Sequence, residues 1–169
     1  MTFLGKLLGK DSLPDLRDAT INLELLGDAE AQIAEFYRLC AAAMESKKDL
    51  WNNLADQELQ HSDKVWKMLE RIKKEPILYK PGVSFSTVTI RLFAVEMQRL
   101  VEQMNLGRIS PDKLFAIALE IEDSAVELSY GKLVKTDDAI YNMLAHQIDE
   151  ESAEHKSAIT SQMNAQSAQ

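Results

Sequence analysis

Glu58 and His61, three residues apart, form the spacing in this sequence most able to do chemistry. Successive residues of an α-helix are about 100° apart, so these two side chains would point within roughly 60° of each other. They also lie inside an apolar stripe, because Leu54 and Val65 continue the same steps of three and four residues. Burying an ionised carboxylate without a counter-charge is costly, so this pair indicates a bound cation or a shared proton.

Four residues on other predicted helices carry the same kinds of group. Glu30 stands where the apolar spacing predicts a hydrophobic residue, His155 lies in another apolar stripe with Glu151 beside it, and Glu122 lies on the flank of a further stripe. Each alone has an ordinary explanation as a core histidine or a solvated glutamate. Their conjunction favours a metal site over a metal-free bundle, since every helix of the predicted bundle supplies such a group.

The elements that would position these residues are helices. Apolar residues recur at steps of three and four, and breaks at proline, glycine and polar runs divide the chain. The pattern predicts helices over about 18–45, 49–74, 87–105, 111–133 and 137–163. The first two and the last two are closely linked, and the helix over 87–105 lies in a long crossover between these two hairpins. We therefore expect one all-α domain over 1–169.

Composition restricts the partners and the compartment. The formal charge of -8 repels phosphate backbones and anionic lipid surfaces, so we expect neither a nucleic-acid nor a membrane partner. The one cysteine, Cys40, cannot form an intramolecular disulfide or a four-thiolate centre, which suits a reducing, cytoplasmic location. The crossover helix has spare apolar surface that would either cover the bundle or form a homodimer interface, at Phe93, Met97, Leu100 and Met104.

Two runs on the first two predicted helices carry a resemblance to a known family. Residues 30–37 (EAQIAEFY) and 54–61 (LADQELQH) resemble the first half of the ferritin-like domain of the rubrerythrin family, and the similarity extends over about 19–160. The resemblance implies a ferritin-like four-helix bundle. In that family each half-site takes a Glu from one helix and a Glu-x-x-His from the next, which maps onto Glu30, Glu58 and His61.

The second half departs from the family pattern. Residues 122–129 (EDSAVELS) look like the second copy of the first-helix motif, with Glu122 as its ligand. Three residues before His155 stands Ser152, however, and Glu151 precedes His155 by four. Either a π-bulge turns Glu151 inward or the second half-site has lost one bridging carboxylate. On an unbroken helix Glu151 and His155 would still lie within about 40° of each other, so we expect Glu151 to be the sixth ligand.

The ligand set and the resemblance together predict a function. Carboxylates with two imidazoles suit iron first, with manganese or zinc as alternatives, and we expect two metal ions. The resemblance implies peroxide reduction or ferrous oxidation, with peroxide or dioxygen as oxidant. Because Cys40 cannot supply a rubredoxin module, an external electron-donor protein is required. Two alternatives stay open: an iron-binding or storage protein, and a helical interaction module with a vestigial metal site. Tyr37 is more simply a core aromatic than a hydrogen-bond partner of the site.

Overall fold

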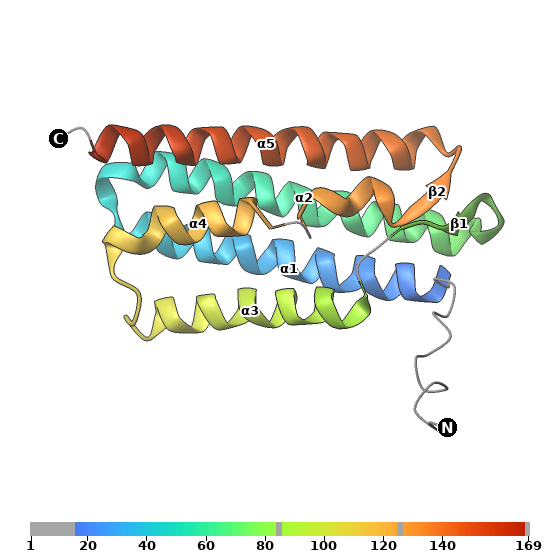
Figure 1. The fold of residues 1–169 in the computed structure, drawn as a ribbon, viewed down its shortest axis with the longest axis horizontal. Helices are drawn as coiled ribbons and strands as arrows, with labels where there is room; N and C mark the ends of the chain where they lie inside the picture. Colours follow the sequence, from blue (N-terminus) through green and yellow to red (C-terminus); the bar gives the residue numbers. More distant parts are fainter. Residues whose placement is uncertain (1–15, 84–85, 125–126, 168–169) are drawn as a thin grey trace, which may run out of the picture.

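The computed structural model describes residues 16–83, 86–124 and 127–167, with the backbone alone at 127–129 and 166–167. These residues form an almost entirely helical molecule whose long helices run side by side (Figure 1). The elements are α1 (Leu16–Ala43), α2 (Lys48–Lys74), β1 (Tyr79–Pro81), α3 (Thr87–Asn105), α4 (Leu114–Glu122), β2 (Val134–Thr136) and α5 (Ala139–Ser167). The all-α expectation is therefore confirmed at the level of helix content.

The helices pack as two neighbouring pairs with α3 outside them. α1 packs along α2 and α3, and α5 packs along α2 and α4 (Figure 1). On α3, Met97 and Leu100 are buried. These two side chains therefore cover the other helices, whereas Val88 and Leu92 on the same helix remain exposed.

The hydrophobic core consists of two clusters that meet at the residues singled out above. On α1, Leu26 belongs to one cluster and Ile33 to the other, and the buried Glu30 stands between them. On α5, Ile148 and Ile159 flank His155 in the same way. The sequence thus interrupts its apolar stripes at one level of the molecule, and a polar layer lies between two apolar ones.

A short ribbon closes one end of the molecule. β1 and β2 pair antiparallel and join the segment after α2 to the segment before α5, where the sequence predicts only loops. At Gly82 the backbone N–H donates to the carbonyl of Leu133 at 3.0 Å, and a Cβ on Gly82 would lie 2.0 Å from the carbonyl oxygen of Lys132. Only glycine permits this close approach of two backbones.

The predicted helix over 111–133 is wrong in its extent. A 3₁₀ turn (Pro111–Lys113) precedes α4, which ends at Glu122, and a second 3₁₀ helix (Glu127–Lys132) follows. Short polar side chains such as Asp123 and Ser124 compete with helical hydrogen bonds, and the Ser124 N–H donates to Ile121, a 3₁₀-type bond that tightens the end. The other four predicted helices match the structure to within a few residues.

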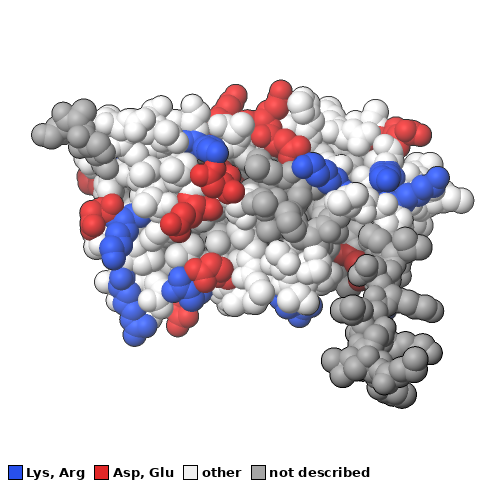
Figure 2. Space-filling view, viewed as in Figure 1, with Lys and Arg blue, Asp and Glu red and all other residues white. Residues whose placement is uncertain are grey.

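Charged side chains of both signs are interspersed over the face that Figure 2 shows. None of the described helices combines the length and the apolarity needed to cross a membrane.

Candidate metal centre

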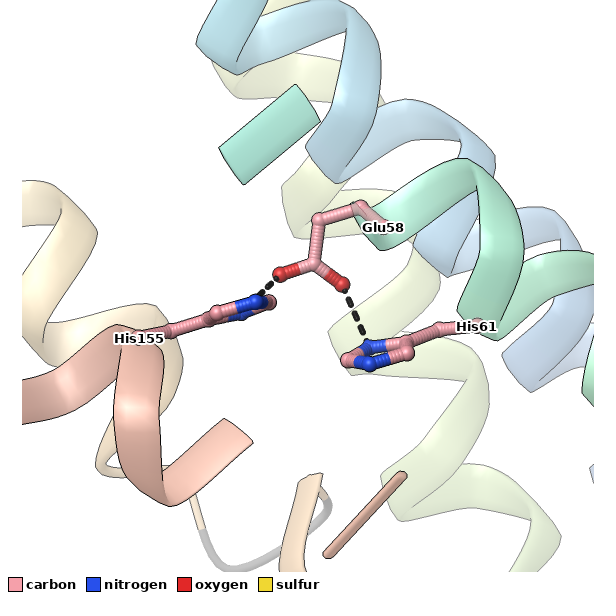
Figure 3. Close-up of side chains that lie close together, drawn as sticks. All are labelled: Glu58, His61 and His155. Atoms are coloured by element: carbon pink, nitrogen blue, oxygen red, sulfur yellow. Dashed lines mark hydrogen bonds and ion pairs between the residues drawn. The ribbon is translucent and has the colours of Figure 1, made fainter. Parts of the chain in front are cut away.

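Glu58 stands between the imidazoles of His61 and His155 (Figure 3). The three residues lie at the level where the two apolar clusters meet. Its Oε2 lies 2.9 Å from Nδ1 of His61 on α2, and its Oε1 lies 2.8 Å from Nδ1 of His155 on α5. The two rings are stacked with centroids 5.3 Å apart. One ligand atom from each of the three residues lies within 4.8 Å of the others, so this buried group could hold a metal ion.

Nδ1 of His155 and Oε1 of Glu58 lie 2.8 Å apart, at the length of an ion pair. Nδ1 of His155 is in fact a fully buried nitrogen with no hydrogen-bond partner among the described residues. Buried polar atoms are rarely left in this state. At 2.8 Å from the Glu58 carboxylate, this nitrogen can either carry the proton of a charged imidazole or offer its lone pair to a cation that both groups bind.

Two further glutamates reach this layer, and each is held by a tyrosine from the opposite half of the chain. Tyr37 on α1 donates to Glu122 on α4 at 2.6 Å, and Tyr130 of the 3₁₀ helix donates to Glu30 on α1. Both glutamates are buried, and Oε1 of Glu122 lies 3.6 Å from Nδ1 of His155. The structure thus brings Glu122 to the cluster of three and places Glu30 in the same layer.

The outer nitrogens of both imidazoles have partners of their own. Nε2 of His61 lies 2.8 Å from Oε2 of Glu151 on α5, and Nε2 of His155 lies 3.1 Å from Oε1 of Gln57 on α2. The Lys64 ammonium donates to the same oxygen of Glu151 at 2.5 Å. Each histidine therefore has its Nδ1 toward Glu58 and its Nε2 toward a residue of the other helix.

This arrangement places Glu151 on the far side of His61 from Glu58. Its side chain is 30% exposed, and it lies outside the group of three buried donors. α5 is α-helical over its whole described length, so no π-bulge turns Glu151 inward. Ser152 occupies the inward position instead: it is 2% exposed, and its hydroxyl has no hydrogen-bond partner among the described residues. His146, by contrast, lies on the outer face, paired with Glu150.

Charges within the layer are balanced by protons. Burial alone would raise the pKa of Glu58, but its contacts with His155 and His61 hold that pKa well below the usual range. Burial lowers the pKa of His155, and the neighbouring carboxylates of Glu122 and Glu58 overcome this and raise it to about 10. The pKa of Glu122 is raised by burial and by the charge on Glu58. A divalent cation would replace these protons rather than add to them.

Four side chains of the site were missed or undervalued at the level of sequence. Tyr37 is a hydrogen-bond donor to Glu122 as well as a core aromatic, and Tyr130, Gln57 and Lys64 were not singled out. Gln57 and Glu151 share a signal that was available, because each stands four residues before a histidine. Residues 125–126 of the expected second motif lie outside the described residues.

Comparison with known proteins returned no match for this chain, either to a protein-family model, to a curated protein or to a solved structure.

Proposed function

We propose that this chain is a metal-dependent redox protein, folded as a ferritin-like four-helix bundle and related to the rubrerythrins that lack a rubredoxin module. The bundle would consist of α1, α2, α4 and α5, with α3 in the long crossover. The observation that carries the proposal is the position of the Glu58 carboxylate between Nδ1 of His61 and Nδ1 of His155. A carboxylate that faces two imidazoles is suited to bridge two cations.

The residues present fit a metal centre, with one departure. Glu30, Glu58, Glu122, His61 and His155 offer oxygen and imidazole donors, a set that suits iron or manganese, and all five are buried. Nδ1 of His155, 2.8 Å from the Glu58 carboxylate, would be a ligand atom once a metal ion displaces its proton. Ser152, at the position where the second half would carry a bridging carboxylate, is the departure. Two metals held by these residues would therefore share one protein bridge instead of two.

Iron bound there would supply the electrons for reducing peroxide or dioxygen, or would itself be oxidised from the ferrous state. The chain's own residues define what surrounds it. Tyr37 and Tyr130 hold Glu122 and Glu30 in place by hydrogen bonds. Reduction of hydrogen peroxide to two waters consumes two protons and two electrons. The electrons must come from an external donor, because Cys40 is the chain's single cysteine and is buried.

The test is metal stoichiometry, measured by elemental analysis after anaerobic loading with Fe²⁺ and removal of excess metal. We expect about two irons per chain in the wild type, as in other carboxylate di-iron bundles. Glu58→Gln should lose most of the metal. Glu150→Gln is the matched control, because Glu150 lies on α5 with its side chain 65% exposed, and it should bind as the wild type does.

The absorption spectrum recorded before and after addition of peroxide completes the test. A change that depends on Glu58 supports the redox function, and iron uptake far beyond two per chain would point to storage instead. A wild type that retains no stoichiometric metal contradicts the proposal and leaves a helical module without metal chemistry.

A further inference from the structure

Each imidazole of the site is held from outside by a residue of the opposite helix. Glu151 on α5 contacts Nε2 of His61 on α2, and Gln57 on α2 contacts Nε2 of His155 on α5. Glu151 and Gln57 each stand four residues before the histidine of their own helix. The same arrangement therefore occurs in both halves of the chain: the residue four positions before each histidine contacts the imidazole of the opposite helix.

Glu151 and Gln57 determine which nitrogen of each ring keeps its hydrogen when the imidazole is neutral. A carboxylate only accepts hydrogen bonds, so Nε2 of His61 must donate to Glu151. The amide oxygen of Gln57 accepts in the same way from His155, and it is oriented by a second donor, the Asn53 amide, at 3.3 Å. In the neutral imidazole Nδ1 then presents its lone pair to Glu58 at 2.9 Å in His61. This separation is that of a hydrogen bond, so either a proton on Nδ1 or a metal ion bound by both groups satisfies the two atoms.

Glu151 and Gln57 differ in charge. Glu151 carries a negative charge that Lys64 helps to maintain, whereas Gln57 is neutral. Hydrogen bonding of a ligating histidine to a carboxylate increases the basicity of its other nitrogen, and an amide does this less. The two contacts thus make Nδ1 of His61 a stronger metal ligand than Nδ1 of His155.

We propose that Glu151 is a positioning residue, not a metal ligand, and that it makes the metal position at His61 the tighter one in the site. This inference rests on the proposed function, because it concerns metal bound between the imidazoles and Glu58. It also explains why the carboxylate of Glu151 is turned toward the outer side of the His61 ring, with its side chain 30% exposed.

The experiment is an anaerobic titration of the metal-free protein with Co²⁺, followed by its visible absorption bands. Removing an outer hydrogen-bond partner typically weakens metal binding by about 10- to 100-fold. We expect Glu151→Gln to weaken the binding of the first Co²⁺ by about 10-fold while its absorption band positions stay unchanged. Glu151→Ala should weaken this binding further. Gln57→Glu, the reciprocal change, should tighten Co²⁺ binding. Gln60→Ala, at an exposed position of α2, is the control and should have a small effect.

A second readout separates a positioning role from a purely structural one. In the Zn²⁺-loaded protein, ¹⁵N NMR should report His61 with its hydrogen on Nε2, and Glu151→Gln should shift the Nε2–H signal without changing the tautomer. Lys64→Gln breaks the ion pair alone and should weaken Co²⁺ binding less than Glu151→Ala does.

The outcomes distinguish the two proposals. A wild type that binds no Co²⁺ contradicts the proposed function. A wild type that binds Co²⁺ with the same affinity as both Glu151 variants overturns this inference alone. Altered band positions in Glu151→Gln would overturn it as well, because they would make Glu151 a direct ligand.

Discussion

Asp138 fastens the start of α5, the helix that carries His155, to two other parts of the molecule. Its Oδ1 accepts from the backbone N–H of Ile140 at 2.9 Å and of Tyr141 at 3.3 Å, as a helix N-cap does. Arg71 at the end of α2 donates to both carboxylate oxygens, at 2.6 and 2.9 Å, and the Tyr79 hydroxyl of β1 donates to Oδ2. Asp138→Ala removes all of these contacts together.

The expected loss of stability follows from the contacts one by one. Removal of an N-cap side chain costs about 1 kcal/mol. Tyr79 is 5% exposed, and a hydroxyl left without its acceptor there costs about 1 to 3 kcal/mol. We therefore expect Asp138→Ala to lower the free energy of unfolding by about 2 to 4 kcal/mol at neutral pH. Asp138→Asn keeps the N-cap and should cost less, and the exposed Asp137→Ala is the control, expected within about 0.5 kcal/mol of the wild type.

The same contacts make the effect depend on pH. The Arg71 guanidinium holds the pKa of Asp138 well below its ordinary value. A carboxyl whose folded pKa is depressed stabilises the protein above its unfolded pKa of about 3.9, and that stabilisation is lost as pH falls toward the folded value. The difference between wild type and Asp138→Ala should therefore be largest near neutral pH and shrink below about pH 4. Urea unfolding of the metal-free proteins at several pH values measures it. A variant as stable as the wild type at pH 7, or a difference that grows on acidification, would refute the reasoning.

Three shorter predictions concern other buried groups. Tyr37→Phe leaves the buried Glu122 without its hydroxyl donor and should destabilise the metal-free protein by about 1 to 3 kcal/mol in urea unfolding; an unchanged midpoint would contradict a role for this bond. Gly82→Ala should lower the thermal midpoint clearly, because its Cβ would lie 2.0 Å from the carbonyl oxygen of Lys132, and a midpoint equal to the wild type would show that the ribbon can shift at no cost. Burial raises the pKa of the Cys40 thiol, so iodoacetamide should label Cys40 slowly in native protein and readily in urea, and equal rates would be inconsistent with a buried thiol.

The long helices were predictable because their stabilisation comes from a repeated pattern. The spacing of apolar residues predicted 49–74 and 87–105, and the structure has α2 over Lys48–Lys74 and α3 over Thr87–Asn105. Many residues contribute to each pattern, so one polar substitution does not change the prediction. Glu30, Glu58 and His155 were recognisable for the same reason, since each interrupts a regular apolar stripe.

The end of α4 was not predictable from the same pattern. The stretch after Glu122 contains enough apolar residues to continue a helix, yet α4 stops there and Tyr130 lies on a 3₁₀ helix, where it donates to Glu30. That bond joins residues 100 positions apart, so no local window contains it. The ribbon was missed for a related reason, because three-residue strands carry too short an alternation to detect.

The roles of Glu151 and Ser152 depend on which helix faces which, and this is the information that a single sequence lacks. In each half, one of the two positions that stand four and three residues before the histidine carries a carboxylate. In the first half it is Glu58, three residues before His61, and in the second half it is Glu151, four residues before His155. The side chains four residues before the histidine, Glu151 and Gln57, contact the outer nitrogen of the opposite imidazole, whereas Glu58, three residues before His61, points inward between the rings. A shift of the carboxylate by one residue therefore moves it from the inside of the polar layer to its outer side. Ser152→Glu should place an inward carboxylate in the second half. We expect this variant to bind its second Co²⁺ more tightly than the wild type, whereas Ser157→Glu on the exposed face of α5 should not.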